Sequence, residues 1–493
     1  MRASTGMNPA SAPAPGPRPR RSTPAVFFPG LLVFVAGLIA TLLWRLTPAD
    51  GWWFPLLAGS AILAFLIWKR IDWADAWSKY LGFGAVVLLA CAVNRLLYIV
   101  GFALGDGSTE YPFYADDPQA AMIKAEIATI GGTLLTVLAW WRGGGARYSP
   151  GLLLSSPRAL LIRLLVVTYV TSLVAMVALA VAPQIQARSG QLLPTMLVLG
   201  ATTGFFLPLL LIRTRLARLL LVTAMGLPFL YVALGTGMKE SIILALAPTA
   251  YLLWNYSPSR GVRLWIALVA VLVVALITSY IGFFRAEVWH AERAVDQSQV
   301  LDEYVQEVAD RGLRETVSRG MEEFLVRNNA VPYRGWALVI ADTEGHEPGL
   351  VFSPLLYVLV PRLLWPGKPE IRQGWEYSGL VFGEHYIAWS DSSLSAGLYP
   401  ALYLGAGWAA VVFGALAIGL LMAICTRLAF AMGGPPLVGL YILSMLPYAL
   451  RLDEAWTVGA FSAPLINLIY IAVIFFGARF AARLTDLRAA RHG

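Results

Sequence analysis

The sequence has few charged residues: they make up 13% of its 493 positions, whereas soluble domains carry roughly 25%. Its apolar residues are grouped in blocks of about 20 instead of amphipathic stripes. This grouping excludes an ordinary soluble enzyme and indicates a membrane protein. Cysteine is also scarce. Cys91 and Cys425 lie far apart inside apolar blocks, which excludes a disulfide framework and the paired spacing of a zinc site.

The apolar blocks predict an all-α polytopic integral membrane protein with about 12 transmembrane helices, each able to cross roughly 30 Å of hydrocarbon. A disordered cytoplasmic tail is expected over 1–24, helices 1–9 over 25–284, a loop over 285–395, helices 10–12 over 396–478, and a second tail over 479–493. The predicted spans are 25–44, 51–68, 80–104, 122–141, 160–182, 193–212, 217–236, 239–255, 264–284, 396–424, 435–450 and 456–478.

The basic residues that give the chain its net charge of +8 predict the orientation in the membrane. Most of them fall in alternate short loops and in the two tails, whereas the loop around Asp106 and Asp117 is purely acidic. Because cytoplasmic loops are enriched in Lys and Arg, both termini are expected to be cytoplasmic. The spread of charge over many loops, without an aromatic-interleaved basic patch, also argues against nucleic acid as a partner.

The loop 285–395 differs from the other loops in length and in charge. It carries 10 Lys/Arg and 17 Asp/Glu, and the predicted orientation places it outside the cytoplasm. The apolar spacing between Asp302 and Asn329 predicts one or two amphipathic helices. Residues 349–365 are apolar but too short and too rich in proline to span, so we expect a re-entrant or interfacial segment.

A group of cations follows that apolar segment. Residues 360–369 read Val-Pro-Arg-Leu-Leu-Trp-Pro-Gly-Lys-Pro, and Arg372 follows. Three prolines stiffen this part of the chain, and Arg can bind a phosphate with two parallel hydrogen bonds. These cations could instead extend toward lipid headgroups, but further ionisable residues occur at the same predicted face: Arg285, Glu287, His290, Glu384, His385, Asp391, Arg451, Asp453 and Glu454. Their convergence indicates a site for a lipid-linked phosphate.

At these residues the sequence resembles the O-antigen polymerases of the Wzy type, also called oligosaccharide repeat unit polymerases. The resemblance rests on the Pro-Arg…Pro-x-Lys-Pro string, on Phe284-Arg285 at the end of a span, on the long external loop, on the turn that ends in Lys239, and on Gly405-x-Gly407 at the start of a later helix. It covers most of the second half of the chain. The turn carries Lys239 where this family usually has Arg.

The resemblance implies a multi-pass glycosyltransferase of the bacterial inner membrane. It would join undecaprenyl-pyrophosphate-linked repeat units into O-antigen, capsule or exopolysaccharide at the periplasmic face, with no cofactor and no catalytic metal. A flippase and a chain-length regulator are implied partners, beside the lipid bilayer. Arg285, Arg362 and Arg372 would then bind pyrophosphate, assisted by Lys368, Lys239 and Arg451. The acceptor would be oriented or deprotonated by one of Glu287, His290, Glu384, His385 or Asp391.

Three other classes of protein remain alternatives. One is a membrane scaffold or regulator of an export pathway, which would tolerate loss of Arg362 and Arg372. An O-antigen ligase-like transferase would share the cation site and differ in its acceptor. A secondary transporter with 12 spans is less favoured, because a duplicated chain should place its long loop centrally and here the long loop follows the ninth span.

Some other ionisable residues are weaker candidates for a functional site. Arg334 stands eleven residues before Gly345, a spacing described for loops of such polymerases, but 45 glycines make such a pair frequent by chance. Lys124 and Glu126 fall within the predicted fourth span, where an ionisable group is a functional hypothesis by default. Both lie near the helix end, so we expect an interhelical pair or contact with headgroups instead.

Overall fold

The computed structural model describes part of the chain from residue 118 onward. The described residues are 118–145, 148, 158–181, 192–236, 242, 246, 249–250, 252–253, 256–257, 259–284, 297–328, 331–360, 365, 367–383, 394–450, 452 and 455–492. Every regular element within them is helical, which agrees with the expected all-α class. The predicted spans 25–44, 51–68 and 80–104 and most of 239–255 lie outside these residues.

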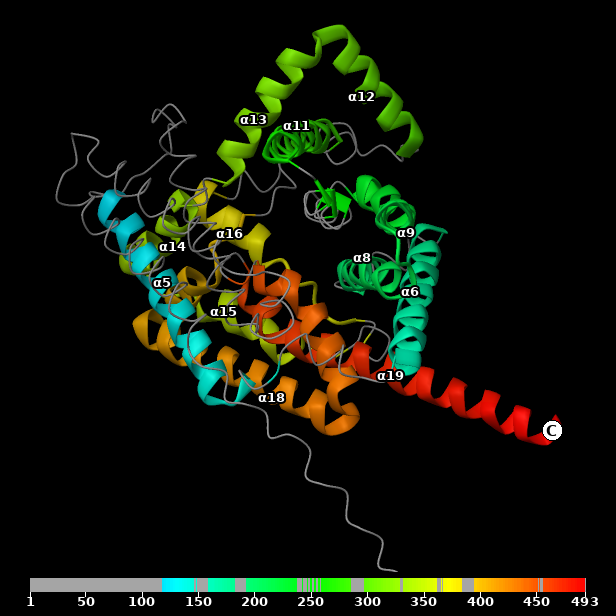
Figure 1. Cartoon of the computed structure of the whole chain (residues 1–493). Helices are drawn as coiled ribbons and strands as arrows, with labels where there is room; N and C mark the ends of the chain where they lie inside the picture. The colour runs from blue at the N-terminus through cyan, green and yellow to red at the C-terminus, as the bar shows by residue number, and fades with distance from the viewer. Residues whose placement is uncertain are drawn as a thin grey trace, which may run out of the picture.

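The helices follow one another along the chain without strands between them in the described ranges. Figure 1 shows their arrangement. They are α5 Pro118–Arg142, α6 Arg158–Val181, α8 Leu192–Leu211, α9 Arg215–Thr236, α11 Arg260–Phe284, α12 Gln297–Arg311, α13 Leu313–Asn328, α14 Val331–Thr343, α15 Pro348–Phe352, the 3-10 helix η5 Ser353–Leu356, α16 Gln373–Phe382, α18 Leu398–Leu450 and α19 Thr457–His492.

Five of the described helices are long and apolar enough to cross a membrane. Each coincides with a span predicted from hydropathy, and the stretch in α18 covers the predicted tenth and eleventh spans together. The five stretches are Leu160–Val177, Arg215–Leu234, Gly261–Phe284, Leu398–Met445 and Thr457–Gly477. Hydropathy locates such helices well because all backbone polar groups of a spanning segment must be paired within it.

The long helix α18 is interrupted at two places. Ala406 and Gly407 have non-helical backbone angles, and so does Gly434. Gly407 has a φ of 65°, a conformation that glycine adopts without the steric cost that a Cβ would add. The sequence motif Gly405-x-Gly407 therefore does open a new helical segment, as expected.

The interface between α5 and α18 brings the two backbones close together. A Cβ added at Gly419 would lie 2.2 Å from the carbonyl oxygen of Thr136, and one at Gly132 would overlap the ring of Tyr399. The Thr136 hydroxyl donates to the carbonyl oxygen of Ala415 at 3.1 Å and lies 3.0 Å from the Tyr399 hydroxyl. Small residues and hydrogen bonds between helices are the usual means of packing where lipid is the solvent.

The expected amphipathic helices are present as α12 and α13. They meet at Gly312 as a splayed hairpin, an inverted V in Figure 1, and α13 packs against α11. At Gly320 in α13, an added Cβ would lie 2.1 Å from the carbonyl oxygen of Ala275 in α11. Val300 and Tyr304 are buried, whereas Val305 and Leu313 are exposed. The hairpin thus packs directly on a candidate membrane span and leaves part of its apolar surface uncovered.

The sequence pattern did not predict α14. This helix lies within the expected external loop, yet Trp336, Ala337, Leu338 and Ile340 are buried in the main hydrophobic core together with residues of α5 and α18. Gly345, with a φ of 111°, follows its end. α14 therefore forms part of the helix bundle.

Candidate functional site

Of the predicted site residues, the structure describes Lys368 and Arg372. The others lie outside the described residues: Lys239, Arg285, Glu287, His290, Arg362, Glu384, His385, Asp391 and Arg451. The two described cations stand on the segment between η5 and α16, and their contacts differ.

Lys368 holds the chain ahead of it in place. Its Nζ donates to the carbonyl oxygens of Val358 and Val360, at 3.0 and 2.9 Å. These carbonyls belong to the turn that follows η5, and an ammonium group is a strong donor to such acceptors. The ammonium of Lys368 thus fixes the turn that leads into Pro361 and Arg362.

Arg372 presents its guanidinium to the surroundings. Its Nε donates to Glu370 Oε2 at 2.6 Å, and both side chains are more than half exposed. The guanidinium also lies 5.4 Å from the ring centroid of Trp375. An exposed ion pair contributes little to stability, so an anion such as a phosphate can replace Glu370 at small cost.

The residue after Arg372 anchors the start of α16. Gln373 is buried, and its Nε2 donates to the carbonyl oxygens of Leu350 and Val351 and to Thr457 Oγ1, at 2.8, 3.1 and 3.1 Å. Thr457 donates in turn to the carbonyl oxygen of Val351 at 2.7 Å. α15, α16 and α19 therefore meet at the Gln373 side chain. The backbone next to Arg372 is thus anchored, while the Arg372 side chain is exposed.

Tyr377, one turn further along α16, joins this helix to α14. Its side chain is fully buried, and its hydroxyl donates to the carbonyl oxygen of Tyr333. Burial raises the pKa of the Tyr377 phenol well above its usual value, because a phenolate would lose its hydration there. Its ring meets Trp456 edge-on at 5.5 Å. The phenol stays neutral and acts as a structural donor.

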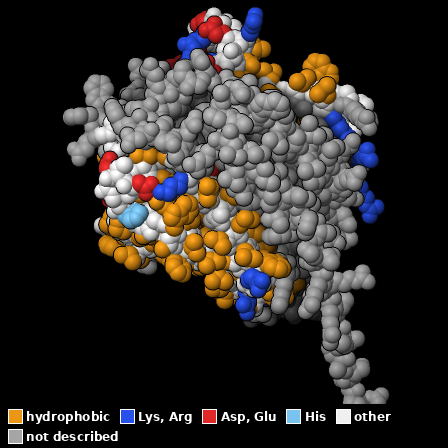
Figure 2. Space-filling view, turned by 90° about the vertical axis from the view of Figure 1, so that its left-hand side faces the viewer, with side chains coloured by type: hydrophobic (Ala, Val, Ile, Leu, Met, Phe, Trp, Pro, Cys, Tyr) orange, Lys and Arg blue, Asp and Glu red, His pale blue; other side chains and the backbone are white. Residues whose placement is uncertain are grey.

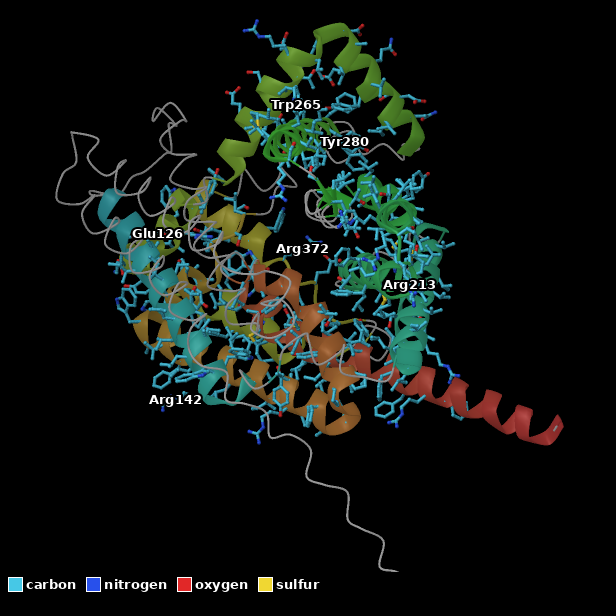
Figure 3. The ribbon with its side chains drawn as sticks, in the orientation of Figure 1. Glu126, Arg142, Arg213, Trp265, Tyr280 and Arg372 are labelled. Carbon is cyan, nitrogen blue, oxygen red and sulfur yellow. The ribbon has the colours of Figure 1, made fainter. Side chains whose placement is uncertain are left out.

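Two ion pairs join α5 to α14. Arg334 Nη1 lies 3.7 Å from Glu126 Oε1, and both side chains are almost fully buried. Lys124 Nζ lies 2.6 Å from Asp342 Oδ2, with side chains 33% and 45% exposed. An interhelical pair or contact with headgroups was expected for Lys124 and Glu126, and the structure shows the first: each pairs with a residue of α14. Figure 3 shows Glu126 near one end of α5 and Arg142 at the other.

Arg334 is a residue whose importance the sequence reasoning missed. It is among the largest fully buried side chains of the described residues. A charged residue is rarely buried unless it is paired, and its partner Glu126 lies on a different helix, more than two hundred positions earlier. Arg334 lies in the first turn of α14, and Gly345 follows the end of that helix.

The acidic residues near these elements do not form a metal site within the described ranges. No group of three or more His, Cys, Asp or Glu side chains that could hold a metal ion is found there.

No curated protein and no solved structure matches the chain. A family model described as "Domain of unknown function (DUF8712)" matches residues 154–448, from just before α6 to near the end of α18. This stretch includes α14, the cations at 368 and 372 and the break at Gly407, but not α5. Because it covers more than half of the sequence, the chain belongs to the DUF8712 family.

Proposed function

We propose that this protein is a membrane glycosyltransferase that joins undecaprenyl-pyrophosphate-linked repeat units into a surface polysaccharide at the periplasmic face of the inner membrane. The observation that carries the proposal is the exposed guanidinium of Arg372. Arg372 stands next to the buried Gln373 and follows the segment 361–369, which contains the cations Arg362 and Lys368. An accessible guanidinium can bind a phosphate group with two parallel hydrogen bonds.

The proposed reaction moves a glycan from one lipid carrier to another. The acceptor hydroxyl oxygen attacks the anomeric carbon of the donor, the bond from that carbon to the pyrophosphate oxygen breaks, and undecaprenyl pyrophosphate leaves. The proton of the hydroxyl passes to one of the proposed bases, Glu287, His290, Glu384, His385 or Asp391. Negative charge grows on the leaving pyrophosphate, so Arg285, Arg362 and Arg372 would act chiefly by stabilising it.

The finer membrane topology belongs to the same proposal: twelve spans, the loop 285–395 in the periplasm and both termini in the cytoplasm. Reporter fusions after residues 150, 260 and 490 are expected to give cytoplasmic signals, and a fusion after residue 320 a periplasmic one. The reason is the enrichment of Lys and Arg in the loops assigned to the cytoplasm. A cytoplasmic signal at residue 320 would place the proposed site on the wrong side of the membrane.

Complementation of a deletion strain tests the proposed activity. Arg362→Ala and Arg285→Ala should each reduce polymerisation about 100- to 1,000-fold, as expected for loss of a group that stabilises transition-state charge. Long polysaccharide chains should then collapse to single repeats, as seen by gel electrophoresis at equal membrane levels of each variant. Arg372→Lys should retain part of the activity, since the positive charge stays and only the bidentate hydrogen bonding to phosphate is lost.

Arg314→Ala is the matched control, because Arg314 is an exposed arginine on α13 within the same loop. It should leave the chain-length distribution unchanged. Persistence of long polysaccharide chains in the Arg362 and Arg285 variants would exclude the polymerase proposal and favour the secondary-transporter alternative. Normal polymerisation with loss of transfer to lipid A core would identify the ligase.

A further inference from the structure

A second polar cluster lies apart from the Arg372 segment, where three helices meet. Lys124 on α5 donates from Nζ to Asp342 Oδ2 on α14 and to the Tyr403 hydroxyl on α18, both at 2.6 Å. Tyr403 donates to Asp342 Oδ1 at 2.7 Å. The three groups thus form a closed ring of hydrogen bonds, in which the position of each group is fixed by the other two.

This ring retains hydrogen-bonding capacity toward its surroundings. An ammonium has three donors and a carboxylate about four acceptor positions. Among the described residues, Lys124 uses two of its donors and Asp342 uses two of its acceptor positions. The Lys124 and Asp342 side chains are 33% and 45% exposed. An ion pair with this exposure adds little to stability, so holding the helices together does not account for its closed geometry.

Aromatic side chains border the ring. Trp408 meets the Tyr403 ring edge-on, with centroids 5.3 Å apart, and is 42% exposed. The His346 ring also meets the Tyr403 ring edge-on, with centroids 6.1 Å apart. The break at Gly407 begins the segment that carries Trp408, and a Cβ added at Gly407 would lie 3.4 Å from His346. The helix break therefore places the partly exposed Trp408 against the Tyr403 ring, whose hydroxyl bonds to both members of the charged pair.

The cluster lies at the edge of an apolar surface. In the described part of the face drawn in Figure 2, acidic, basic and histidine side chains lie close together beside an area of hydrophobic side chains. Phe413 and Val412, one turn beyond Trp408, are exposed, and so is Ile127 on α5. A ligand bound here would have polar contacts at the cluster and apolar protein surface, or lipid, beside it.

From these contacts we infer that Lys124, Asp342 and Trp408 form a saccharide-binding site. Neighbouring hydroxyls of a sugar both donate and accept hydrogen bonds, so one can accept from the Lys124 ammonium while the next donates to the Asp342 carboxylate. The apolar C–H face of the sugar ring packs on Trp408. Asp342 is a binding group and not the catalytic base, since each of its oxygens already accepts a hydrogen bond.

This site deepens the proposed function and rests on it for the identity of the ligand, which would be the glycan of a lipid-linked substrate. The pyrophosphate would be bound by the cations of the 360–372 segment, and the sugar would be bound by the cluster. The cluster would then determine which sugars are accepted, while the rate of bond cleavage would depend on the arginines.

Binding of the purified full-length protein in detergent to an array of lipid-free bacterial oligosaccharides tests the site. The wild type is expected to bind at least one class of glycan. Asp342→Asn and Trp408→Leu should each weaken that binding about 10- to 100-fold, as expected for loss of a hydrogen bond to a charged group or of a stacking surface. Size-exclusion profiles confirm that each variant is folded.

Two control variants match these changes. Glu344→Gln removes an exposed carboxylate two residues from Asp342, and Trp265→Leu removes an exposed tryptophan of α11. Trp265 is labelled in Figure 3, far from α5. Both variants should bind glycans like the wild type.

The results separate this inference from the proposed function. Absence of glycan binding by the wild type, or equal binding by wild type and the Asp342→Asn and Trp408→Leu variants, would overturn the saccharide site. If Arg362→Ala abolishes long chains while these two variants still bind glycans normally, the polymerase stands and the site is wrong. If glycan binding is lost in them but Arg362→Ala has no effect, the site stands without the polymerase.

Discussion

Glu126→Leu is expected to destabilise the protein by about 3–5 kcal/mol, because it leaves the buried guanidinium of Arg334 without its carboxylate partner. Arg334 is fully buried and Glu126 nearly so. Removal of one member of a buried pair costs more than the pair itself contributes, since the remaining charge has lost both water and its counterion. Arg334→Met should have an effect of similar size.

The double variant Glu126→Leu/Arg334→Met provides the decisive comparison. With both charges gone, the apolar side chains can pack between α5 and α14, so the double variant should be less destabilised than either single variant. SDS titration of the purified protein in mixed micelles measures the free energy of unfolding. Destabilisation of the double variant by the sum of the single effects would show that the two residues do not act as a pair.

Lys124→Met is the matched control for this experiment. It removes the other ion pair between the same two helices, but Lys124 and Asp342 are partly exposed. Loss of such a pair should cost about 0–1 kcal/mol. The contrast between the two pairs separates the effect of burial from the effect of removing a charge from α5.

Gly419→Ala is expected to destabilise the protein by about 2–3 kcal/mol through overpacking of the α5–α18 interface. The added Cβ would lie 2.2 Å from the carbonyl oxygen of Thr136 and 2.8 Å from the Cβ of Ala139. A backbone oxygen cannot rotate away as a side chain can, so the helices must separate. Separation also breaks the hydrogen bond from Thr136 to the carbonyl oxygen of Ala415.

Gly131→Ala, on α5 itself, is the control for that change. A Cβ at Gly131 has no other atom within 4 Å, so the substitution should stabilise the helix by up to about 1 kcal/mol. The same unfolding titration measures both variants. Equal stability of the Gly419 and Gly131 variants would mean that α5 and α18 are not in close contact at this point.

Part of this fold follows from local sequence pattern. The apolar stretches of α6, α9, α11, α18 and α19 match predicted spans, because the length of an apolar run is a local property set by the thickness of the hydrocarbon layer. The amphipathic helices between Asp302 and Asn329 and the break at Gly407 were likewise readable from spacing and from glycine.

The tertiary structure decided the rest. No local pattern marks α14 as buried, since its sequence mixes Pro, Arg and Asp with apolar residues, and its burial depends on α5 and α18 on either side. Lys124 and Asp342 are 218 positions apart, and Lys124 and Tyr403 are 279 apart. Hydropathy and charge patterns along the chain are enough to show which segments are apolar enough to span and where charge accumulates. Which charges meet was determined by packing, because a partner on another helix has no fixed spacing along the chain.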